Sequence, residues 1–525
     1  MVFLIESNLC HTAPGFEMPE RFVQSIPLTR SVREGYQFGS FENGRVSGEV
    51  SGIVDEMPRL SASTQLSADV VKPAYDRAAL KPGIVHIGLG AFHRAHQAVY
   101  TDEALGKAFG DWGIVGVSLR SVDIVHDLRA QDGLYSVVTR SGAGDSVRVI
   151  GSIVRSLSGT EDRDEILALL ADPGTKIVTI TVSEKAYGLD PVSGGLDRNH
   201  PSIAADLANP TTPIGVIGYI VEGLSRRHAM DLPPFTVLCC DNLPTNGRIV
   251  RRLVIEMAGS RDPALANWIF GQGAFPSSMV DRIVPAATEE ARARAHKLLG
   301  VEDRQSLETE PFMQWVIEDH FLSGRPAWET AGALFVDDVE PYEKMKLRLL
   351  NGSHSLIAYL GQLKGLEYVR DVMRVPEYVA LVRRHMAEAI KTLDPVPGID
   401  LERYMDQLIE RFENPTIAHK TQQIAMDGTQ KLLQRIFAGA VETLAKGDDA
   451  SSAAYVVALW IAYVQKTAEV NDPRAAELKA AAAKVTEEDP SAPFFAISGL
   501  FPQTLIENSA WRARVNAQIG KMSAG

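Results

Sequence analysis

Short apolar runs, each bounded by polar or glycine residues, recur through the first half of the chain. Each is four to seven residues long, which suits a buried strand, and the stretches that follow them suit helices or polar loops. This pattern predicts an open α/β sheet. The predicted strands are Ile84 to Ile87, Gly113 to Leu119, Lys176 to Val182 and Phe235 to Cys240.

The pattern changes from about Pro341 onward. Apolar residues then recur with the helical period, and runs of β-branched residues become scarce. This part of the chain is therefore predicted to be mostly α-helical. The predicted helices are Glu402 to Phe412, Thr421 to Ala438, Ala453 to Lys466 and Ala475 to Ala483. The apolar stretch Ala453 to Val464 is too short to cross a bilayer, which favours a core helix.

The length of 525 residues favours two domains over one core. The first 57 residues mix Gly, Ser, Pro and charges without sustained periodicity, which is typical of a flexible arm. We therefore expect a flexible arm over residues 1–57, an α/β domain over residues 58–334 and a helical domain over residues 335–525.

The charge balance narrows the class of partner. The formal net charge is −13, and the basic residues form no cluster. Nucleic acids and anionic membrane surfaces bind basic faces, so neither is expected as a partner. No window reaches about 18 uninterrupted apolar residues, and the first residues lack the pattern of a signal peptide. We expect a cytoplasmic protein whose partner is a small molecule, while the sequence gives no indication of oligomeric state.

Cysteine and histidine residues give no metal-site pattern. Cys10, Cys239 and Cys240 have neither zinc-type spacing nor a disulfide framework, which fits a reducing compartment. His93 and His96 have a spacing that metal ligands can adopt, but no third ligand is evident. We therefore expect no metal.

A glycine-rich turn follows the first predicted strand. It reads Gly88-Leu-Gly90-Ala-Phe92-His93-Arg94 and runs into a helix-compatible stretch. Backbone N–H groups of such a turn, with the helix N-terminus, can hold a pyrophosphate. The third glycine of the dinucleotide-binding pattern is replaced by His93, so the fingerprint is incomplete. An ordinary strand-to-helix loop is the alternative.

An acidic residue follows the second predicted strand, where the adenosine ribose of a dinucleotide usually binds. This residue is Asp123, at a longer interval from Gly88 than is usual. A carboxylate here favours NAD. The nearby Arg120 leaves NADP open, because an arginine can pair with a 2′-phosphate.

The segment KMKLRLLNGSHS brings Lys346, Asn351 and His354 within nine residues. On a continuous α-helix His354 lies about 80° and Asn351 about 140° round from Lys346, so all three share one broad face. A lysine desolvated among apolar residues can act as a general base, while Asn and His donate hydrogen bonds to an oxygen that gains charge. The trio predicts alcohol oxidation or carbonyl reduction. The alternative is an amphipathic helix with a solvated lysine, an Asn-Gly turn and a core histidine.

Polar residues also follow the later predicted strands. Ser183-Glu184-Lys185 comes after Lys176 to Val182, and Asp241-Asn242 comes after Phe235 to Cys240. Ligands of open α/β sheets bind beyond the carboxyl ends of the strands. These residues are therefore candidates for the site, although capped loops are the ordinary alternative.

Taken together, these segments resemble the mannitol dehydrogenase family of long-chain polyol dehydrogenases and reductases. The resemblance runs from about residue 58 to near the C-terminus, in one order along the chain. It rests on IVHIGLGAFHRAHQ, GVSLRSVD, TVSEKAYG, CCDNLPTNG, FPSSMVDRIVP, QWVIEDHF, the segment with Lys346, Asn351 and His354, and IAMDGTQK.

The resemblance implies a Rossmann-type dinucleotide-binding domain followed by a mostly α-helical C-terminal domain, with metal-independent, NAD-dependent catalysis between them. It makes Lys346 the general base, and Asn351 and His354 the groups that polarise the reacting oxygen. The cofactor-binding residues that follow from the turn and the resemblance are Gly88, Gly90, Phe92, Arg94 and Asp123. The residues implied on the substrate side are Asn242, Asp281, Glu184, Glu343, Lys431 and Lys185.

Within the family the motifs point to two kinds of substrate. SEKAYG, HKTQQIAMDGTQK, IVPAAT and LLNGSHS are more similar to the reductases of open-chain sugar acids, whereas VPGIDL and GVSLRSVD are more similar to the mannitol enzymes. We expect a hexonate, D-mannonate oxidised to D-fructuronate, with mannitol or another polyol as the alternative. Lys185, His419, Lys420 and Lys431 are the cationic candidates for its carboxylate. A sugar or dinucleotide sensor without catalysis is the alternative of another class.

Overall fold

The computed structural model describes residues 57–190 and 193–523. The residues from Pro58 onward form one compact unit. The arm predicted for residues 1–57 lies, apart from Met57, outside the described residues.

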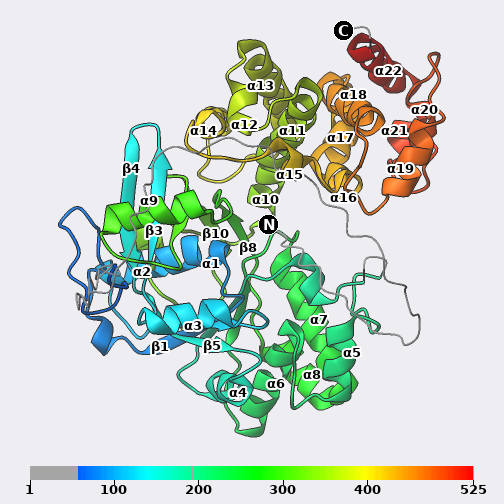
Figure 1. The fold of residues 1–525 in the computed structure, drawn as a ribbon. Coiled ribbons are helices and arrows are strands. Elements are labelled where there is room, and N and C mark those ends of the chain that lie inside the picture. The colour runs from blue at the N-terminus through cyan, green and yellow to red at the C-terminus, as the bar shows by residue number, and fades with distance from the viewer. Residues whose placement is uncertain (1–56, 191–192, 524–525) are drawn as a thin grey trace, which may run out of the picture. The chain divides into compact units, whose positions relative to one another are not determined.

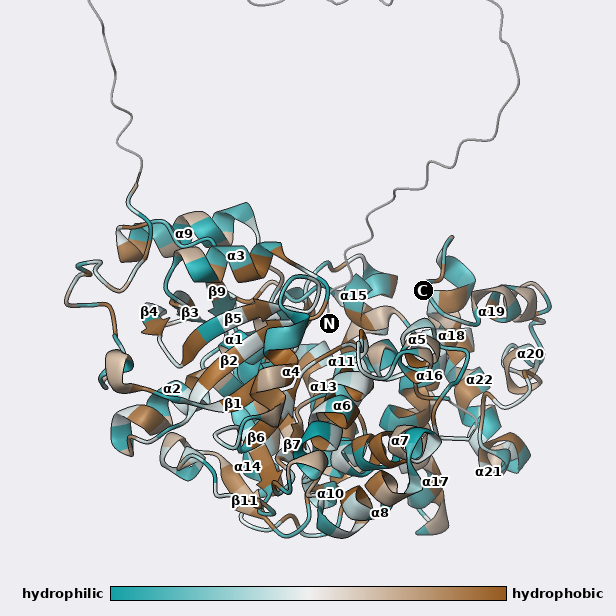
Figure 2. Cartoon of the chain, turned by 90° about the horizontal axis from the view of Figure 1, so that it is seen from below, coloured by the Kyte–Doolittle hydropathy of each residue, from teal (hydrophilic) through white to brown (hydrophobic). Residues whose placement is uncertain are grey.

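A five-stranded parallel sheet forms the centre of the N-terminal half, in the order β5-β2-β1-β6-β7. Four of its strands are those predicted from the apolar runs, and they are brown in Figure 2 because their residues are mostly hydrophobic. The strands of this sheet are β1 (Pro82–Ile87), β2 (Gly113–Ser118), β5 (Ile153–Ser158), β6 (Ile177–Ile180) and β7 (Thr236–Cys239).

The order of the strands indicates where on the sheet a ligand is expected to bind. Counted along the chain, the five strands lie in the order 3-2-1-4-5, so the direction of winding reverses between β1 and β6. In open α/β sheets the crevice at such a reversal, beyond the carboxyl ends of the strands, binds the ligand. The predicted Rossmann-type fold is confirmed.

Two smaller sheets were not expected from the sequence. One has the order β4-β3-β9 and the other β11-β10-β8. Several of their strands have only three to five residues, too few to show a period. Their bounds are β3 (Tyr135–Ser141), β4 (Gly144–Ile150), β8 (Ser278–Asp281), β9 (Leu307–Thr309), β10 (Gln314–Glu318) and β11 (Leu334–Val336).

The helices of the N-terminal half connect these strands, and α10 leads out of this half. They are α1 (Ala91–Ala95), α2 (Gln97–Lys107), α3 (Asp123–Ala130), α4 (Arg163–Ala171), α5 (Pro201–Ala208), α6 (Val216–Ala229), α7 (Asn246–Arg261), α8 (Pro263–Gln272), α9 (Glu289–Leu299) and α10 (Glu340–Lys346). The domain boundary predicted between residues 334 and 335 stays a prediction. Strand β11 spans that position.

The C-terminal half is helical, as predicted, and Figure 1 shows its helices grouped apart from the strands. The helices are α11 (Gly352–Lys364), α12 (Val369–Met373), α13 (Pro376–Ile390), α14 (Leu401–Glu413), α15 (Thr421–Ala425), α16 (Gly428–Leu432), α17 (Ala438–Ala445), α18 (Ser451–Lys466), α19 (Ala475–Ala482), α20 (Ala492–Phe495), α21 (Gln503–Glu507) and α22 (Ser509–Ser523). None among the described residues is long and apolar enough to cross a membrane.

The prediction of a single helix over Thr421 to Ala438 is wrong. The chain breaks at Asp427, which has a φ of +57°, between α15 and α16. A π-helical turn, η5 (Leu433–Phe437), then separates α16 from α17. Apolar residues recur on both sides of each interruption, so apolar spacing alone predicted one helix.

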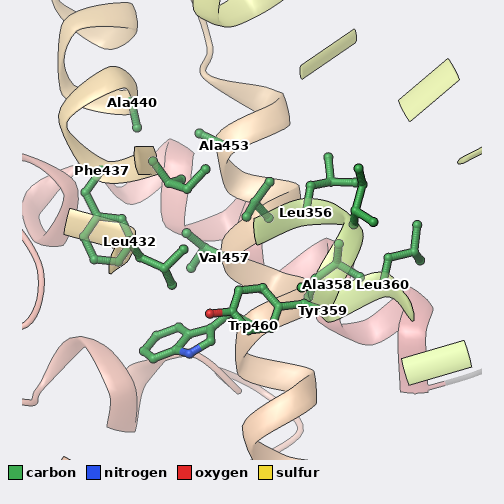
Figure 3. Close-up of a cluster of buried hydrophobic side chains, with 14 of the residues drawn as sticks. Leu356, Ala358, Tyr359, Leu360, Leu432, Phe437, Ala440, Ala453, Val457 and Trp460 are labelled. Carbon is green, nitrogen blue, oxygen red and sulfur yellow. The ribbon is translucent and has the colours of Figure 1, made fainter. Parts of the chain in front are cut away.

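Each half has its own buried core. Side chains of β1, β2, β6 and β7 pack against α4, α6 and α7 in the N-terminal half. In the C-terminal half the core centres on α11 and α18, and Figure 3 shows Leu432 and Phe437 beside Val457 of α18. The helical core thus anchors η5 through Phe437, which is fully buried.

Candidate active site

The predicted base, Lys346, ends α10 and reaches across to the sheet-containing half. Its side chain is buried. Its Nζ lies 2.6 Å from Asn242 Oδ1, just beyond β7, and 2.5 Å from the carbonyl oxygen of Val280 in β8. Two residues remote in sequence from Lys346 thus orient its amine.

Burial is the main cause of a lowered pKa for Lys346. The positive charges of Arg411 and Arg435 lower it as well, while the carboxylates of Asp281 and Glu343 act in the opposite direction. A lowered pKa makes the neutral amine, the form that can accept a proton, more available near neutral pH.

The helix that carries the predicted trio is not a continuous α-helix. A π-helical turn, η4 (Leu347–Asn351), separates Lys346 from Gly352. The extra residue in this turn rotates all that follows, so the offsets expected for a regular helix are wrong. Such π-helical turns often occur at functional sites. Asn351, half-buried, ends the turn.

His354 is buried in the first turn of α11. Its ring lies 4.8 Å from that of Phe412 and 5.0 Å from that of His419. Burial, and then the neighbouring His419 and Arg435, hold its pKa well below the usual value. Its Nε2 has no hydrogen-bond partner among the described residues. His354 is therefore neutral, with a buried nitrogen unused by the protein.

Asp281 ends β8 and forms an ion pair that sequence analysis did not reveal. Both its carboxylate oxygens accept from Arg411 of α14, at 2.7 and 3.0 Å. Arg411 also donates to Glu310 at 2.8 and 3.0 Å, and all three side chains are buried. Burial acts to raise the pKa of Asp281, but Arg411 outweighs it and the pKa is lowered. The substrate role of Asp281 stays a prediction.

Glu343, one turn before Lys346, makes a further contact between the halves. Its Oε2 accepts from the backbone N–H of Thr245 at 3.0 Å. Thr245 has a φ of +46°, which is rare for a β-branched residue and tends to occur at functional sites. Burial raises the pKa of Glu343 to about 7, although Lys346 acts to lower it.

The polar residues beyond β6 and β7 are held together by Asp241. Its carboxylate accepts from Tyr187 Oη at 2.6 Å and from the Val182 N–H at 2.9 Å. Burial raises the pKa of Asp241 to about 7. Glu184 and Lys185 lie in the same segment, in a short 3-10 helix, and both are exposed.

Lys431 and Arg435 extend the site from the other side. Lys431 Nζ lies 3.4 Å from the carbonyl oxygen of Ile424 and 3.9 Å from Asp427 Oδ2, and burial lowers its pKa to about 8. Arg435 lies on η5, which contacts η4, and its Nη1 lies 3.5 Å from the carbonyl oxygen of Asn351. Arg435 was missed, because an arginine in a helical segment resembles a solvated one.

The glycine turn after β1 fits a dinucleotide. Gly88 has a φ of +110°, and a Cβ there would lie 1.8 Å from the carbonyl oxygen of Thr181, so only glycine is accommodated. A Cβ on Gly90 would meet nothing closer than 3.8 Å. The turn follows β1, next to the point where the direction of winding reverses, and α1 comes after it. Asp123 is exposed in the first turn of α3, after β2.

Two other residues of the predicted cofactor set have contacts within the protein. The half-buried Phe92 stacks on His96, with ring centroids 5.0 Å apart. Arg94 is buried, donates to the carbonyl oxygen of Gln305 at 2.7 Å and lies over the ring of Tyr135. The cofactor roles of Phe92 and Arg94 stay predictions.

The histidines considered as metal ligands have structural contacts. His93, in place of the third glycine, stacks on His86 with ring centroids 3.3 Å apart, and His96 Nε2 donates to the carbonyl oxygen of Gln314. Within residues 57–190 and 193–523 no group of three His, Cys, Asp or Glu residues is placed to hold a metal ion.

Comparison with known proteins agrees with this geometry. Residues 82–330 match the model of the mannitol dehydrogenase Rossmann domain, and residues 338–523 match that of the mannitol dehydrogenase C-terminal domain. D-mannonate oxidoreductase of Escherichia coli is 44% identical over 459 residues, which cover 85% of this chain and 94% of the relative. Mannitol 2-dehydrogenase of Aspergillus terreus is 43% identical, with 78% of this chain and 85% of the relative covered.

Solved structures give the same result. The Pseudomonas fluorescens mannitol 2-dehydrogenase, in a ternary complex with NAD and D-mannitol, is 37% identical with a TM-score of 0.78. The alignment covers 89% of this chain and 97% of that one. A substrate-free D-sorbitol dehydrogenase is 33% identical with a TM-score of 0.82, and 89% and 100% of the two chains are covered. This chain therefore belongs to the mannitol dehydrogenase family and is a dehydrogenase with a Rossmann domain.

Proposed function

We propose that this protein oxidises D-mannonate to D-fructuronate with NAD, and catalyses the reverse reduction. The reaction converts one secondary alcohol of an open-chain hexonate into a ketone. NAD supplies the hydride acceptor, and the turn at Gly88 and Gly90 with the carboxylate of Asp123 holds it. An exposed carboxylate at Asp123 accepts ribose hydrogen bonds and repels the 2′-phosphate of NADP.

Lys346, Asn351 and His354 act on the substrate hydroxyl. Neutral Lys346 accepts the hydroxyl proton as the hydride leaves the same carbon. Asn351 and neutral His354 donate hydrogen bonds to the oxygen, which carries negative charge until the ketone forms. Asn242 holds the Lys346 amine in place, at 2.6 Å. The supporting observation is that Lys346 and His354 are both buried with lowered pKa values.

The choice of a sugar acid rests on Lys431. Identity to the relatives does not separate the substrates, since D-mannonate oxidoreductase and mannitol 2-dehydrogenase are 44% and 43% identical to this chain. Lys431 has its pKa lowered to about 8 by burial, and its nearest carboxylate oxygen is 3.9 Å away. A desolvated cation with a weak ion pair suits an anionic substrate better than a neutral polyol.

The second candidate is a polyol dehydrogenase that acts on mannitol. It is supported by the VPGIDL segment and by the likeness to the mannitol 2-dehydrogenase of known structure. The two candidates differ at the end of the substrate remote from the reaction, which is a carboxylate in mannonate and a hydroxymethyl group in mannitol.

A substrate panel tests both candidates. Purified protein is mixed with NAD and with D-mannonate, D-altronate, D-mannitol, D-arabinitol or D-sorbitol in turn, and NADH formation is followed by absorbance. We expect the highest kcat/KM for mannonate. Efficient mannitol oxidation without mannonate oxidation would establish the second candidate instead, and NADH binding without turnover of any sugar would indicate a sensor.

A further inference from the structure

Arg435 is half-buried, and it differs from the buried arginines of the helical half in having no carboxylate partner. Arg348 forms an ion pair with Glu442, and Arg411 forms ion pairs with Asp281 and Glu310. Arg435 has no carboxylate oxygen within 4.0 Å among the described residues. Its one hydrogen bond there is the long contact of 3.5 Å to the Asn351 carbonyl oxygen. The guanidinium therefore keeps most of its donors for another group.

The position of Arg435 links it directly to the reacting groups. It lies on η5, which contacts η4, the turn that ends at Asn351. Its positive charge lowers the pKa values of Lys346, His354 and Lys431, so it acts electrostatically on all three. Phe437, two residues later and fully buried, fixes η5 against the helical core (Figure 3). The guanidinium is thus held on a packed element.

The local charge balance favours an anion. Lys431 and Arg435 are two cations on neighbouring helical elements, and Lys431 precedes Arg435 by one helical turn. Burial lowers the pKa of Arg435 to about 10, despite the opposing charges of Glu184 and Asp427. A desolvated cation without a close counter-ion is stabilised when an anion binds.

We infer that Arg435 is a specificity-determining residue that binds the carboxylate of an open-chain hexonate, with Lys431 as a second cation. This inference rests on the proposed function. The guanidinium presents two parallel N–H donors, which match the two oxygens of a carboxylate. Its contact with Asn351 keeps the carboxylate at a fixed distance from the group that polarises the reacting oxygen. A neutral polyol leaves the guanidinium unpaired, so Arg435 also discriminates against polyols.

The other cations named from the sequence fit this role less well. Lys420 is exposed and lies 3.2 Å from Glu367. His419 is neutral at physiological pH, because burial lowers its pKa to about 4. Lys185 is exposed in the short 3-10 helix beyond β6 and is not without a partner. Arg435, by contrast, contacts η4 directly through the carbonyl oxygen of Asn351.

The test uses Arg435→Gln, Arg435→Lys and a matched control, Arg383→Gln. Arg383 is an exposed arginine of the helical half that lies 2.7 Å from Asp406. We expect Arg435→Gln to lower kcat/KM for D-mannonate about ten- to a hundredfold, mainly through KM, which is the usual effect of a charge-assisted hydrogen bond. D-mannitol should lose less, because it has no carboxylate to bind and is affected only through the raised pKa of Lys346. Arg435→Lys keeps the charge and should recover part of the loss, and Arg383→Gln should match the wild type.

A binding measurement gives a second readout that does not depend on turnover. D-mannonate is titrated calorimetrically into the NADH-bound enzyme, in which no oxidation can occur. Arg435→Gln should weaken this binding by the same factor and remove its dependence on ionic strength. Should Arg435→Gln not fold, Arg435→Lys and the ionic-strength dependence of the wild type carry the same test.

The outcomes separate the inference from the proposed function. Mannonate oxidation by the wild type, with unchanged efficiency in Arg435→Gln, would overturn the inference and leave the proposed function intact. Mannonate that binds without being oxidised, and does so through Arg435, would overturn the proposed function and support the anion site. A wild type that neither binds nor oxidises mannonate would overturn both.

Discussion

The sheet-containing half and the helical half position their functional groups by different means. In the first half they follow regular strands: the glycine turn comes after β1, Asp123 after β2 and Asn242 after β7. In the helical half, Asn351 and Arg435 lie on the π-helical turns η4 and η5. A parallel sheet gathers groups at one edge by its topology. In the helical half these two groups lie where the regular course of a helix is altered, whereas Lys346 and His354 lie on regular α-helices.

The halves also differ in the contacts that their charged side chains make. Arg227, in the sheet-containing half, donates to four backbone carbonyl oxygens at 2.7 to 3.5 Å. Lys431 and Arg435, in the helical half, have only contacts of 3.4 to 3.9 Å. Weakly paired charge in a partly desolvated site is costly, and its presence there supports the proposal that the helical side binds the substrate. Changing one half at a time tests this division.

The largest effect is expected for Lys346→Ala. Loss of the base should lower kcat for alcohol oxidation by about 10² to 10⁴-fold, the usual span for general acid–base catalysis. NADH binding should stay near the wild-type value, because Lys346 contacts no part of the predicted cofactor turn. Steady-state kinetics and fluorescence titration with NADH measure the two properties. Near wild-type turnover would remove Lys346 from the mechanism.

The pH dependence of the wild type complements this variant. Only the neutral Lys346 amine accepts a proton, so alcohol oxidation should rise with pH as the amine deprotonates. Because burial lowers the pKa of Lys346, this rise should come below the pH at which ordinary lysines titrate. A kcat profile that stays flat up to the pH of ordinary lysines would contradict the assignment.

A loss of stability is expected next, for Arg411→Met, which breaks the ion triad between the halves. The substitution leaves Asp281 and Glu310 buried without their cation. The expected cost is about 3–5 kcal/mol, typical of removing one member of a buried pair. Urea unfolding followed by circular dichroism measures it. The control is Arg383→Met, which breaks an exposed pair with Asp406 and should cost about 0–1 kcal/mol. Equal midpoints for the two variants would show that the triad does not hold the halves together.

The sequence predicted the sheet-containing half better than the helical one. The strands at Ile84, Gly113, Lys176 and Phe235 were predicted because buried parallel strands are short, apolar and bounded by turn residues. In the helical half the helices at Glu402, Ala453 and Ala475 are confirmed, and α14, α18 and α19 begin within two residues of them. The break at Asp427 and the turn η4 were not predicted, since insertion of one residue into a helix leaves no mark in composition.

The residues of the candidate site also differ in how well the sequence predicted them. Lys346, Asn242 and Asp281 could be named from motifs, but Arg411, the partner of Asp281, could not be. Arg411 and Arg435 belong to amphipathic helical segments in which an arginine normally faces solvent. Arg411 is buried against β8 and Arg435 contacts η4, and both contacts are long-range ones that a local pattern does not contain.

A smaller effect is expected for Asp123→Ala, which changes the sheet-containing half alone. Removing the carboxylate should weaken NAD binding by about tenfold, the worth of one charge-assisted hydrogen bond, and relax the preference against NADP. The kcat at saturating NAD should change little. Dissociation constants for NADH and NADPH, measured by fluorescence, check this. An unchanged cofactor preference would place the ribose contact on another residue.

The smallest effect is expected for Glu343→Gln, which tests the electrostatic coupling of the halves. Burial raises the pKa of Glu343 to about 7, so the carboxyl is mainly neutral below that pH and charged above it. In its charged form it raises the pKa of Lys346 and so keeps the amine protonated. Glutamine removes that charge while it can keep one oxygen for the Thr245 N–H.

The acid limb of the pH profile for alcohol oxidation should therefore move to lower pH in Glu343→Gln. At a fixed pH on that limb, kcat should rise by about threefold, which is the size expected of one charge across a partly solvated site. Profiles of kcat against pH for the wild type and the variant measure the shift. A shift to higher pH would mean that Glu343 assists proton removal instead of opposing it.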